Sequence, residues 1–361
     1  MKDYNDTMSY IVKKYCAIKD IISIYNWGDP STPGISDIDI VFVLKDNTSK
    51  SLPLLRRSFY FLNSKARYLV RHPFVFIGKN SFENIRQVYP NANLNLLYGQ
   101  NISIKNLSSD EAHQFEIALL NDIIIRHYPR DFLEQAVSRK INARDTMLRL
   151  NSLKYTARIL ESITKKRNAE WNNSLSLVEK LRKNWFEFND FEMLASLNQK
   201  AVEITMQMTE EFREFLVRSN QVEIISSGNE EVTYSGMKNK SKFVKNWDKE
   251  KALHEMSKHV KDDRVYQSIL PIELSAQLIE YSKNKGPISD YVRNNIGIEE
   301  GLSYRLKHKN IVVQRINILN SQAELAFHIK HSDFAAFFDF GYCNKSGINN
   351  LILGRLRRWV R

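Results

Sequence analysis

Cysteine is scarce in this sequence, and long apolar runs are absent. Cys16 and Cys343 are the only cysteines among 361 residues, which excludes a disulfide framework and a multi-thiolate metal site. A helix that crosses a membrane needs roughly 20 consecutive apolar residues, and no run approaches that length. The segment 1–6 carries two acids and no apolar core, so no secretory signal is expected. The sequence therefore predicts a cytoplasmic protein.

Several familiar sequence signatures are also missing. There is no Walker-type phosphate loop, no dinucleotide-binding fingerprint and no zinc-finger spacing, which excludes the sites that those motifs build. There is no internal repeat and no low-complexity tract. The 43% hydrophobic and 11% aromatic residues are ordinary for a folded protein. The length allows two or three domains of roughly 100–200 residues each.

The charge balance is basic. Lys and Arg number 53 against 41 Asp and Glu, a formal net charge of +12. A positive field attracts polyanions such as nucleotides, nucleic acids, phosphorylated glycans and anionic lipids. A basic surface that serves only solubility is the other interpretation, and composition does not choose between the two.

Apolar periodicity predicts an α+β protein with three regions. Residues 1–105 read as an N-terminal α/β domain, residues 106–220 as a central helical bundle, and residues 221–361 as a mixed α+β region. The elements expected in the first region are a helix over 8–24, a strand over 38–44, a helix over 52–65 and a strand over 68–77.

The later regions are expected to hold long helices and two strand pairs. The expected helices cover 110–128, 130–167, 174–186, 190–218 and 262–283. The expected strand pairs are 222–225 with 231–234, a hairpin around Ser227-Gly228-Asn229, and 311–318 with 323–329.

The segment 25–43 combines a glycine- and proline-rich turn with a strand. A helix is expected to lead into this turn, and the strand is expected to begin at about Asp37. Side chains alternate along a strand, so Asp37 and Asp39 point to one face, and Ile38 and Ile40 to the other. Two strand steps separate the acids by roughly 7 Å at the Cα atoms. Such a pair can share Mg²⁺ or Mn²⁺, because hard cations take carboxylate and phosphate oxygens.

Glycines in the turn complement the two acids. Gly28 and Gly34 let backbone N–H groups approach an anion closely. Phosphoryl transfer needs both parts, since metals neutralise the phosphate oxygens and fixed donors orient them.

The segment resembles the signature of the DNA polymerase β-like nucleotidyltransferase superfamily. That signature is a Gly-Ser pair followed about ten residues later by Asp-hydrophobic-Asp-hydrophobic. Gly28 and the run Gly34-Ile35-Ser36-Asp37-Ile38-Asp39-Ile40 match it. A small α/β domain followed by helices is similar to the layout of the minimal and aminoglycoside-type nucleotidyltransferases. The resemblance is confined to the first region, residues 1–105, which it identifies as the catalytic domain.

This resemblance implies a reaction and a set of site residues. A nucleoside monophosphate would pass from an NTP, with ATP the expected nucleotide, to an acceptor hydroxyl, and pyrophosphate would leave. Asp37 and Asp39 would be the catalytic and metal-binding residues. The residues expected to hold the nucleotide in this segment are Gly28, Asp29, Ser31, Gly34 and Ser36.

One departure from the family pattern is Asp29, which replaces the serine after the first glycine. A carboxylate repels a phosphate unless a metal intervenes or the group is protonated. The alternative hydroxyl donors are Ser31, Thr32 and Ser36.

A second departure is the missing third carboxylate, which the family often has on a neighbouring strand. The nearest candidates for a base are His72 and Glu83. Two-carboxylate members of the superfamily exist, so this absence does not exclude catalysis.

The helical region supplies basic side chains for a charged ligand. Five of them fall near one helical face: Lys140, Arg144, Lys154, Arg158 and Lys165. We predict that Lys154 and Arg158 contact the nucleotide phosphates. A solvated helix face is the other interpretation.

Three functions stay open at the level of sequence. The first is a Mg²⁺-dependent nucleotidyltransferase whose acceptor is a sugar phosphate, a small molecule, a protein or an RNA. The second is a catalytically weakened member of the same fold that binds nucleotide or acts as a scaffold. The third is an RNA-directed protein that uses the positive charge. The oligomeric state does not follow from the sequence.

Overall fold

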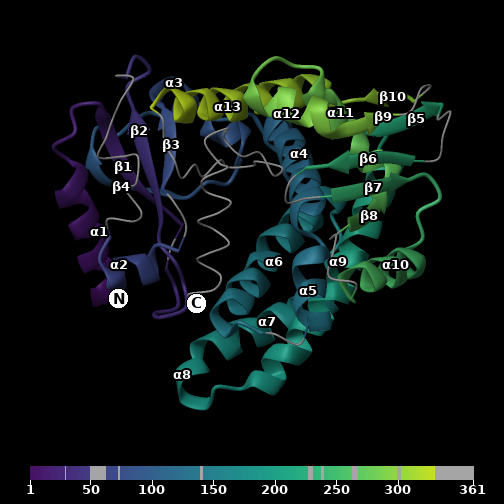
Figure 1. Cartoon of the computed structure of the whole chain (residues 1–361), viewed down its shortest axis with the longest axis horizontal. Coiled ribbons are helices and arrows are strands. Elements are labelled where there is room, and N and C mark those ends of the chain that lie inside the picture. The colour runs from purple at the N-terminus through teal and green to yellow at the C-terminus, as the bar shows by residue number, and fades with distance from the viewer. Residues whose placement is uncertain are drawn as a thin grey trace. The chain divides into compact units, whose positions relative to one another are not determined.

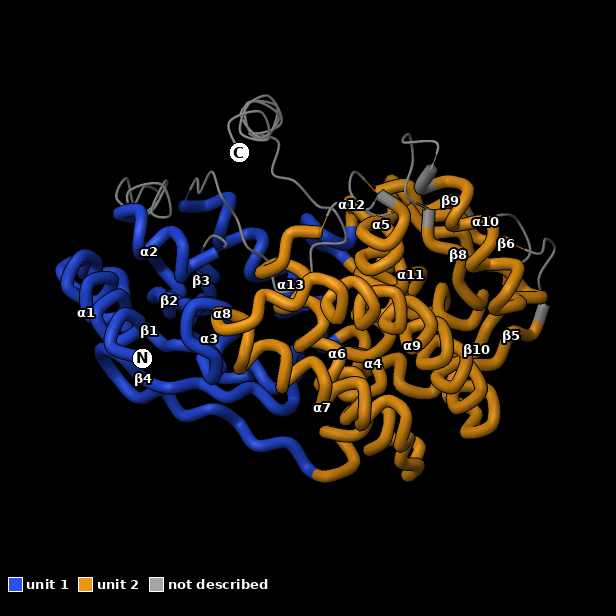
Figure 2. Tube along the Cα trace, turned by 90° about the horizontal axis from the view of Figure 1, so that it is seen from below, with its two compact units in different colours: residues 1–108, 285–289, 314–361 blue, residues 109–284, 290–313 orange. Residues whose placement is uncertain are grey.

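The computed structural model describes residues 1–28, 30–48, 62–71, 74–138, 141–226, 231–236, 240–261, 267–298 and 302–329. The chain is mixed α+β, as the sequence predicts. It forms two compact units (Figure 2). Unit 1 holds the described residues within 1–108, 285–289 and 314–361, and unit 2 holds those within 109–284 and 290–313. Among the described helices, none is long and apolar enough to span a membrane.

Unit 1 is built around a four-stranded sheet with the strand order β3-β2-β1-β4 (Figure 1). β1 runs antiparallel to both β2 and β4, and β2 runs parallel to β3. The strands are β1 (Ile21–Trp27), β2 (Asp39–Leu44), β3 (Val75–Gly78) and β4 (Leu94–Gly99). The helices of this N-terminal part are α1 (Lys2–Tyr15), α2 (Ser64–Leu69), α3 (Lys79–Glu83) and the 3-10 turn η2 (Ile85–Gln87).

The core of unit 1 follows the alternation of side chains along β2. Ile40 and Phe42 are buried on the sheet face that packs with α1. The ring of Tyr15, at the end of α1, meets the Phe42 ring edge-on at a centroid distance of 5.4 Å. On the opposite face, Tyr25 of β1 packs on Phe82 of α3 at 4.7 Å. β2 is therefore covered on both faces, which suits its continuous apolar sequence.

Two expected elements of unit 1 are wrong in their extent. The helix predicted over 8–24 ends at Tyr15, and residues 21–27 form β1. The run Ile21-Ile22-Ser23-Ile24-Tyr25 is β-branched and aromatic, and pairing with β2 and β4 on both sides decides its structure. A strand, not a helix, therefore leads into the Gly28 turn.

The strand predicted over 68–77 is also shorter than expected. β3 covers only Val75–Gly78, while Tyr68 and Leu69 belong to α2. Asn63 caps α2 by accepting a hydrogen bond from the Ala66 N–H at 2.8 Å, which fixes the start of that helix. Most of the helix predicted over 52–65, together with His72, lies outside the described residues.

The helical part of unit 2 agrees with the sequence pattern. Three of its described helices carry side-chain caps that the sequence supplies: Asn142, Asn168 and Asp190 each accept a hydrogen bond from a first-turn N–H. The helix predicted over 130–167 is divided into α5 and α6. The helices are α4 (Ser109–His127), α5 (Arg130–Ser138), α6 (Ala143–Thr164), α7 (Ala169–Lys183), α8 (Trp185–Phe188) and α9 (Phe191–Arg218).

Unit 2 also contains two sheets. β5 pairs with β10, and a four-stranded sheet has the order β8-β7-β6-β9. The hairpin predicted from 222–225 and 231–234 is wrong, because β5 and β6 belong to different sheets. The strands are β5 (Val222–Ser226), β6 (Glu231–Ser235), β7 (Lys240–Val244), β8 (Gln267–Pro271), β9 (Ile296–Ile298) and β10 (Ser303–Leu306).

The two four-stranded sheets share one arrangement of strands. In unit 2, β6 runs antiparallel to β7 and β9, and β7 runs parallel to β8. These are the relations of β1 to β2 and β4, and of β2 to β3, in unit 1. A glycine follows the first strand in each case, Gly28 after β1 and Gly236 after β6. The sequence shows no repeat, so this likeness is visible only in the topology.

The last two predicted elements need correction. The strand pair predicted over 311–318 and 323–329 is instead one helix, α13 (Lys309–His328). Its fully buried apolar residues recur at intervals of three and four, which is helical spacing: Val312, Ile316, Leu319, Ala323 and Ala326.

A helix is predicted over 262–283, but the described residues of this range begin with a strand. β8 occupies Gln267–Pro271 and is followed by the 3-10 turn η3 (Ile272–Leu274) and α11 (Ser275–Ser282). Pro271 ends the strand, because proline has no N–H to donate to a ladder. The remaining helices among the described residues are α10 (Lys249–Lys261) and α12 (Pro287–Asn295).

Candidate functional site

The two predicted metal ligands lie at the start of β2. The strand begins at Asp39 rather than at Asp37, but the alternation extends further, because the Ile38 N–H donates to the Leu69 carbonyl at 2.9 Å. Ile38 and Ile40 are fully buried, whereas Asp37 and Asp39 are half-buried. The two carboxylates therefore alternate with core residues at one end of the sheet of unit 1.

Gly28 adjoins this acidic pair across the β1–β2 ladder. Asp39 pairs with Trp27, the last residue of β1, and Gly28 comes next. Gly28 has a φ of +82°, and the place where a Cβ would stand has no atom within 4 Å other than those of its two neighbours in the chain. Its N–H already donates to the Asn93 carbonyl at 2.8 Å. The glycine thus provides a left-handed turn with open space beside it, but its N–H is not available to a ligand.

A buried tyrosine holds the rest of the turn. The Tyr4 Oη accepts from the Gly34 N–H at 3.0 Å and donates to the Ser36 carbonyl at 2.7 Å. The Ser36 Oγ accepts from the Thr32 N–H at 3.1 Å. Tyr68 donates to the Gly34 carbonyl at 2.8 Å. Gly34 and Ser36, both expected to hold phosphate, are thus engaged in the turn itself.

The exposed hydroxyl of the turn belongs to Ser31, whereas Thr32 and Ser36 are buried. Of the hydroxyl donors that the sequence suggests, Ser31 is the one that a ligand can reach. The contribution of Tyr4 was missed, because a tyrosine in the first turn of an amphipathic helix gives no signal beyond core packing.

Of the three residues connected with the departures from the family pattern, Glu83 is the one that the structure describes. Asp29 and His72 lie outside the described residues. Glu83 ends α3, and its carboxylate lies 3.9 Å from the Lys79 ammonium. Over the described ranges, no group of three or more His, Cys, Asp or Glu side chains could hold a metal. The acidic site, as far as the described chain defines it, is a pair.

Lys154 and Arg158 belong to unit 2, on α6, whereas the acidic pair belongs to unit 1. The Lys154 ammonium donates to the Asn151 side chain at 3.2 Å and lies 4.9 Å from the centre of the Tyr155 ring. Arg158 is exposed. Lys140, the first residue of the predicted basic face, lies outside the described residues. A phosphate contact by Lys154 and Arg158 stays a prediction.

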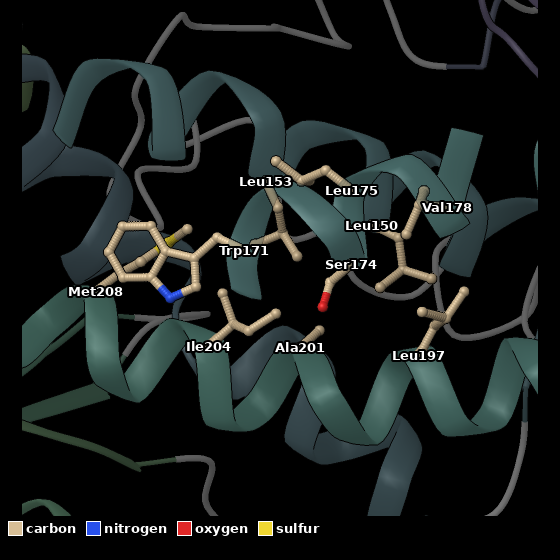
Figure 3. A pocket seen from close by; sticks show the side chains of 10 residues that line it. All are labelled: Leu150, Leu153, Trp171, Ser174, Leu175, Val178, Leu197, Ala201, Ile204 and Met208. Carbon is tan, nitrogen blue, oxygen red and sulfur yellow. The ribbon is translucent and has the colours of Figure 1, made fainter. Parts of the chain in front are cut away.

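Unit 2 contains a small apolar cavity among α6, α7 and α9 (Figure 3). Its volume of about 10 Å³ is close to the minimum that one water needs. Trp171 closes one side, and its indole N–H donates to the Gln207 side chain at 3.0 Å. Ser174 is the one polar residue in a lining of Leu, Ile, Val, Ala, Met and Trp. This cavity is a packing defect in the core and is too small for a nucleotide.

Comparison with known proteins adds no assignment. The sequence matches no protein-family model, and no curated protein or solved structure matches the chain. Any functional inference therefore depends on the acidic pair, the adjoining glycine turn and their common position in the fold.

Proposed function

We propose that the protein is a Mg²⁺-dependent nucleotidyltransferase, with the acidic site in unit 1. The observation that carries the proposal is the contrast in burial between neighbouring side chains of residues 37–40. Ile38 and Ile40 are buried in the core, while Asp37 and Asp39 between and beside them stay half-buried. Two carboxylates that stay accessible beside buried residues at one end of a strand form a donor set that a divalent cation takes.

The donor set fits a hard cation. Asp37 and Asp39 would hold Mg²⁺ or Mn²⁺ together with phosphate oxygens, since Mg²⁺ takes one or two carboxylates and fills its other positions with phosphate and water. The ion, when bound, would neutralise charge on the triphosphate. The open space beside Gly28 supports the fit, because it leaves room for a phosphate next to the acids.

The chain's own residues divide the work of holding the nucleotide. Gly28 leaves the space, and the exposed Ser31 hydroxyl is the available donor of the turn. Gly34 and Ser36, tied to Tyr4, keep that turn in one shape. ATP is the nucleotide we expect, and a phosphate contact by Lys154 and Arg158 of unit 2 stays a prediction from the sequence. The acceptor is a sugar phosphate, a small molecule, a protein or an RNA.

The test is release of pyrophosphate from each labelled NTP with Mg²⁺ or Mn²⁺ and a cell extract as the acceptor source. Asp39→Asn and Asp37→Asn should each lower the rate on the order of 1,000-fold. Asp6→Asn is the matched control, an equal change at an exposed position of α1 in the same unit, and should keep full activity. Turnover that survives Asp39→Asn would refute the proposal.

A second candidate is a nucleotide-binding protein of the same fold without turnover. It is favoured by the engagement of the Gly28 and Gly34 N–H groups inside the protein, which leaves fewer donors for a transferring phosphate. Equilibrium binding of ATP with Mg²⁺ distinguishes the two. Binding that is lost in Asp39→Asn, with no pyrophosphate from any NTP, would favour this second candidate.

A further inference from the structure

A second pocket lies in unit 2, where α6 and α9 end, and the nucleotidyltransferase proposal does not use it. Its volume is about 220 Å³. α9 lines it with positions i, i+3, i+4 and i+7, which share one helix face: Glu211, Glu214, Phe215 and Arg218. The remaining lining residues are Thr164, Lys166 and Ser219.

Two of the four charged groups in this pocket satisfy each other. Arg218 and Glu214 form an ion pair at 2.9 Å. Glu211 and Lys166 are left, and neither forms an ion pair with another described residue. They come from different segments, Glu211 from α9 and Lys166 from the connection after α6. The pocket therefore presents one carboxylate and one ammonium that act on each other electrostatically but form no ion pair with any described residue.

The surroundings of Glu211 favour a cation. Burial raises the pKa of its carboxyl; Lys166 opposes that rise, and Glu214 and Glu161 add to it. α6 ends at Thr164 and α9 at Arg218, and the carbonyl groups at helix C-termini carry partial negative charge. Phe215 also lines the pocket, and aromatic rings attract cations to their faces. A carboxylate placed in this way gains from an ammonium partner.

Lys166 favours an anionic partner. It is an exposed ammonium on the rim of the same pocket, and a carboxylate is a natural partner for it. A ligand that satisfies both groups carries an ammonium and a carboxylate. The volume is below the roughly 300–1,000 Å³ of pockets for drug-sized molecules, so the ligand is the size of a small metabolite.

We propose that this pocket binds a free α-amino acid, whose ammonium group contacts Glu211 and the ends of α6 and α9, and whose carboxylate contacts Lys166. The site is separate from the acidic pair in unit 1. Its test needs no nucleotide, so the outcome does not depend on the nucleotidyltransferase proposal.

The first experiment uses the full chain and varies the ligand. Each common L-amino acid is titrated at millimolar concentration in saturation-transfer NMR and calorimetry. The tightest binder is then compared with its N-acetyl derivative, which lacks the ammonium, and its amide, which lacks the carboxylate. Each derivative should bind about tenfold more weakly. No binding by any amino acid, or a loss below about threefold for either derivative, would overturn the proposal.

The second experiment varies the protein. Glu211→Gln and Lys166→Gln should each weaken binding of that amino acid about tenfold. Glu192→Gln and Lys180→Gln are the matched controls, both at exposed helical positions of unit 2, and should leave it unchanged. Circular dichroism verifies folding of each variant. Equal binding by the pocket variants and the controls would overturn the assignment of this pocket. The ligand series uses the wild-type chain, so its outcome does not depend on the folding of any variant.

Discussion

The two four-stranded sheets have the same strand order and strand directions but opposite chemistry at the same place. In unit 1, Asp39 pairs with Trp27, the last residue of β1. In unit 2, Lys240 pairs with Ser235, the last residue of β6. An arrangement of strands therefore does not make a metal site by itself. The residue at the loop end of the hairpin decides whether that end attracts a cation or an anion.

The strands that carry these residues differ in burial as well. From Ile40 onward β2 is buried at every position, whereas β7 alternates between buried and accessible residues. Lys242 of β7 forms an ion pair with Glu231 of β6 at 2.6 Å, a surface interaction worth little. β2 is thus a buried support for one charged end, whereas β7 keeps a polar face.

The largest expected effect comes from replacing one buried phenylalanine in each sheet, which tests whether the two cores contribute equally to stability. Phe42 and Phe243 occupy matching positions in the two hairpins, and both are fully buried. Replacing either by Ala should lower the free energy of unfolding by about 3–5 kcal/mol. Differential scanning calorimetry measures the loss. Phe188→Ala, at a side chain that is 71% exposed, is the control, and an equally small effect at Phe42 or Phe243 would contradict the described cores.

Lowering the pH should destabilise the protein through His308, which lies in unit 2. Burial lowers the pKa of His308 from 6.5 to about 4. The folded state therefore excludes a proton that the unfolded chain binds below pH 6.5, and stability is lost as the pH falls from 6.5 towards 4. The loss should reach on the order of 3 kcal/mol.

The measurement is urea unfolding of the wild type and of His308→Leu across that pH range. The difference in unfolding free energy between them should shift in favour of the variant as the pH falls. It should be constant above pH 7, where both states of His308 are neutral. A pH-independent difference would show that His308 is not shielded from protonation.

Removal of one hydroxyl should loosen the turn that distinguishes unit 1. Tyr4→Phe takes away the acceptor of the Gly34 N–H and the donor to the Ser36 carbonyl. Leaving such groups unsatisfied costs about 1–3 kcal/mol. Thermal unfolding gives the loss, with Tyr10→Phe of the same helix as the control, since Tyr10 is only partly buried. Equal effects of the two changes would argue against a role for Tyr4 in the turn.

The smallest expected effect compares the two glycines that follow the matching strands. Gly28 has a φ of +82°, whereas Gly236 has no positive φ. Alanine at position 28 should cost about 1–2 kcal/mol of unfolding free energy from backbone strain, and alanine at position 236 should lack that penalty. Chemical denaturation measures both. If Gly236→Ala destabilised the protein as much as Gly28→Ala, the conformational difference between the two glycines would be refuted.

The sequence predicted well those elements whose local signals agree with their packing. The strand over 38–44 matches β2, because its apolar and β-branched run suits a strand buried on both faces. The helices between 109 and 218 were predicted from periodicity, and α6, α7 and α9 also have capping residues at their starts. The candidate acids were found in the same way, from their alternation with Ile38 and Ile40.

Elements with ambiguous local signals were mispredicted. Residues 21–24 continue a helical pattern from α1 yet form β1, because two neighbouring strands take their hydrogen bonds. Residues 311–318 are rich in β-branched side chains yet belong to α13. Propensity is a weak preference, and tertiary packing overrides it in both segments.

The sequence by itself determined the acid pair, the glycine-containing turn before it and the alternation that separates carboxylates from core, because these depend on neighbours along the chain. Only the tertiary structure decided which strands pair, that Tyr4 holds the Gly34 turn, and that Glu211 and Lys166 share a pocket. Those contacts join residues far apart in sequence, and their formation depends on the burial that the whole fold provides.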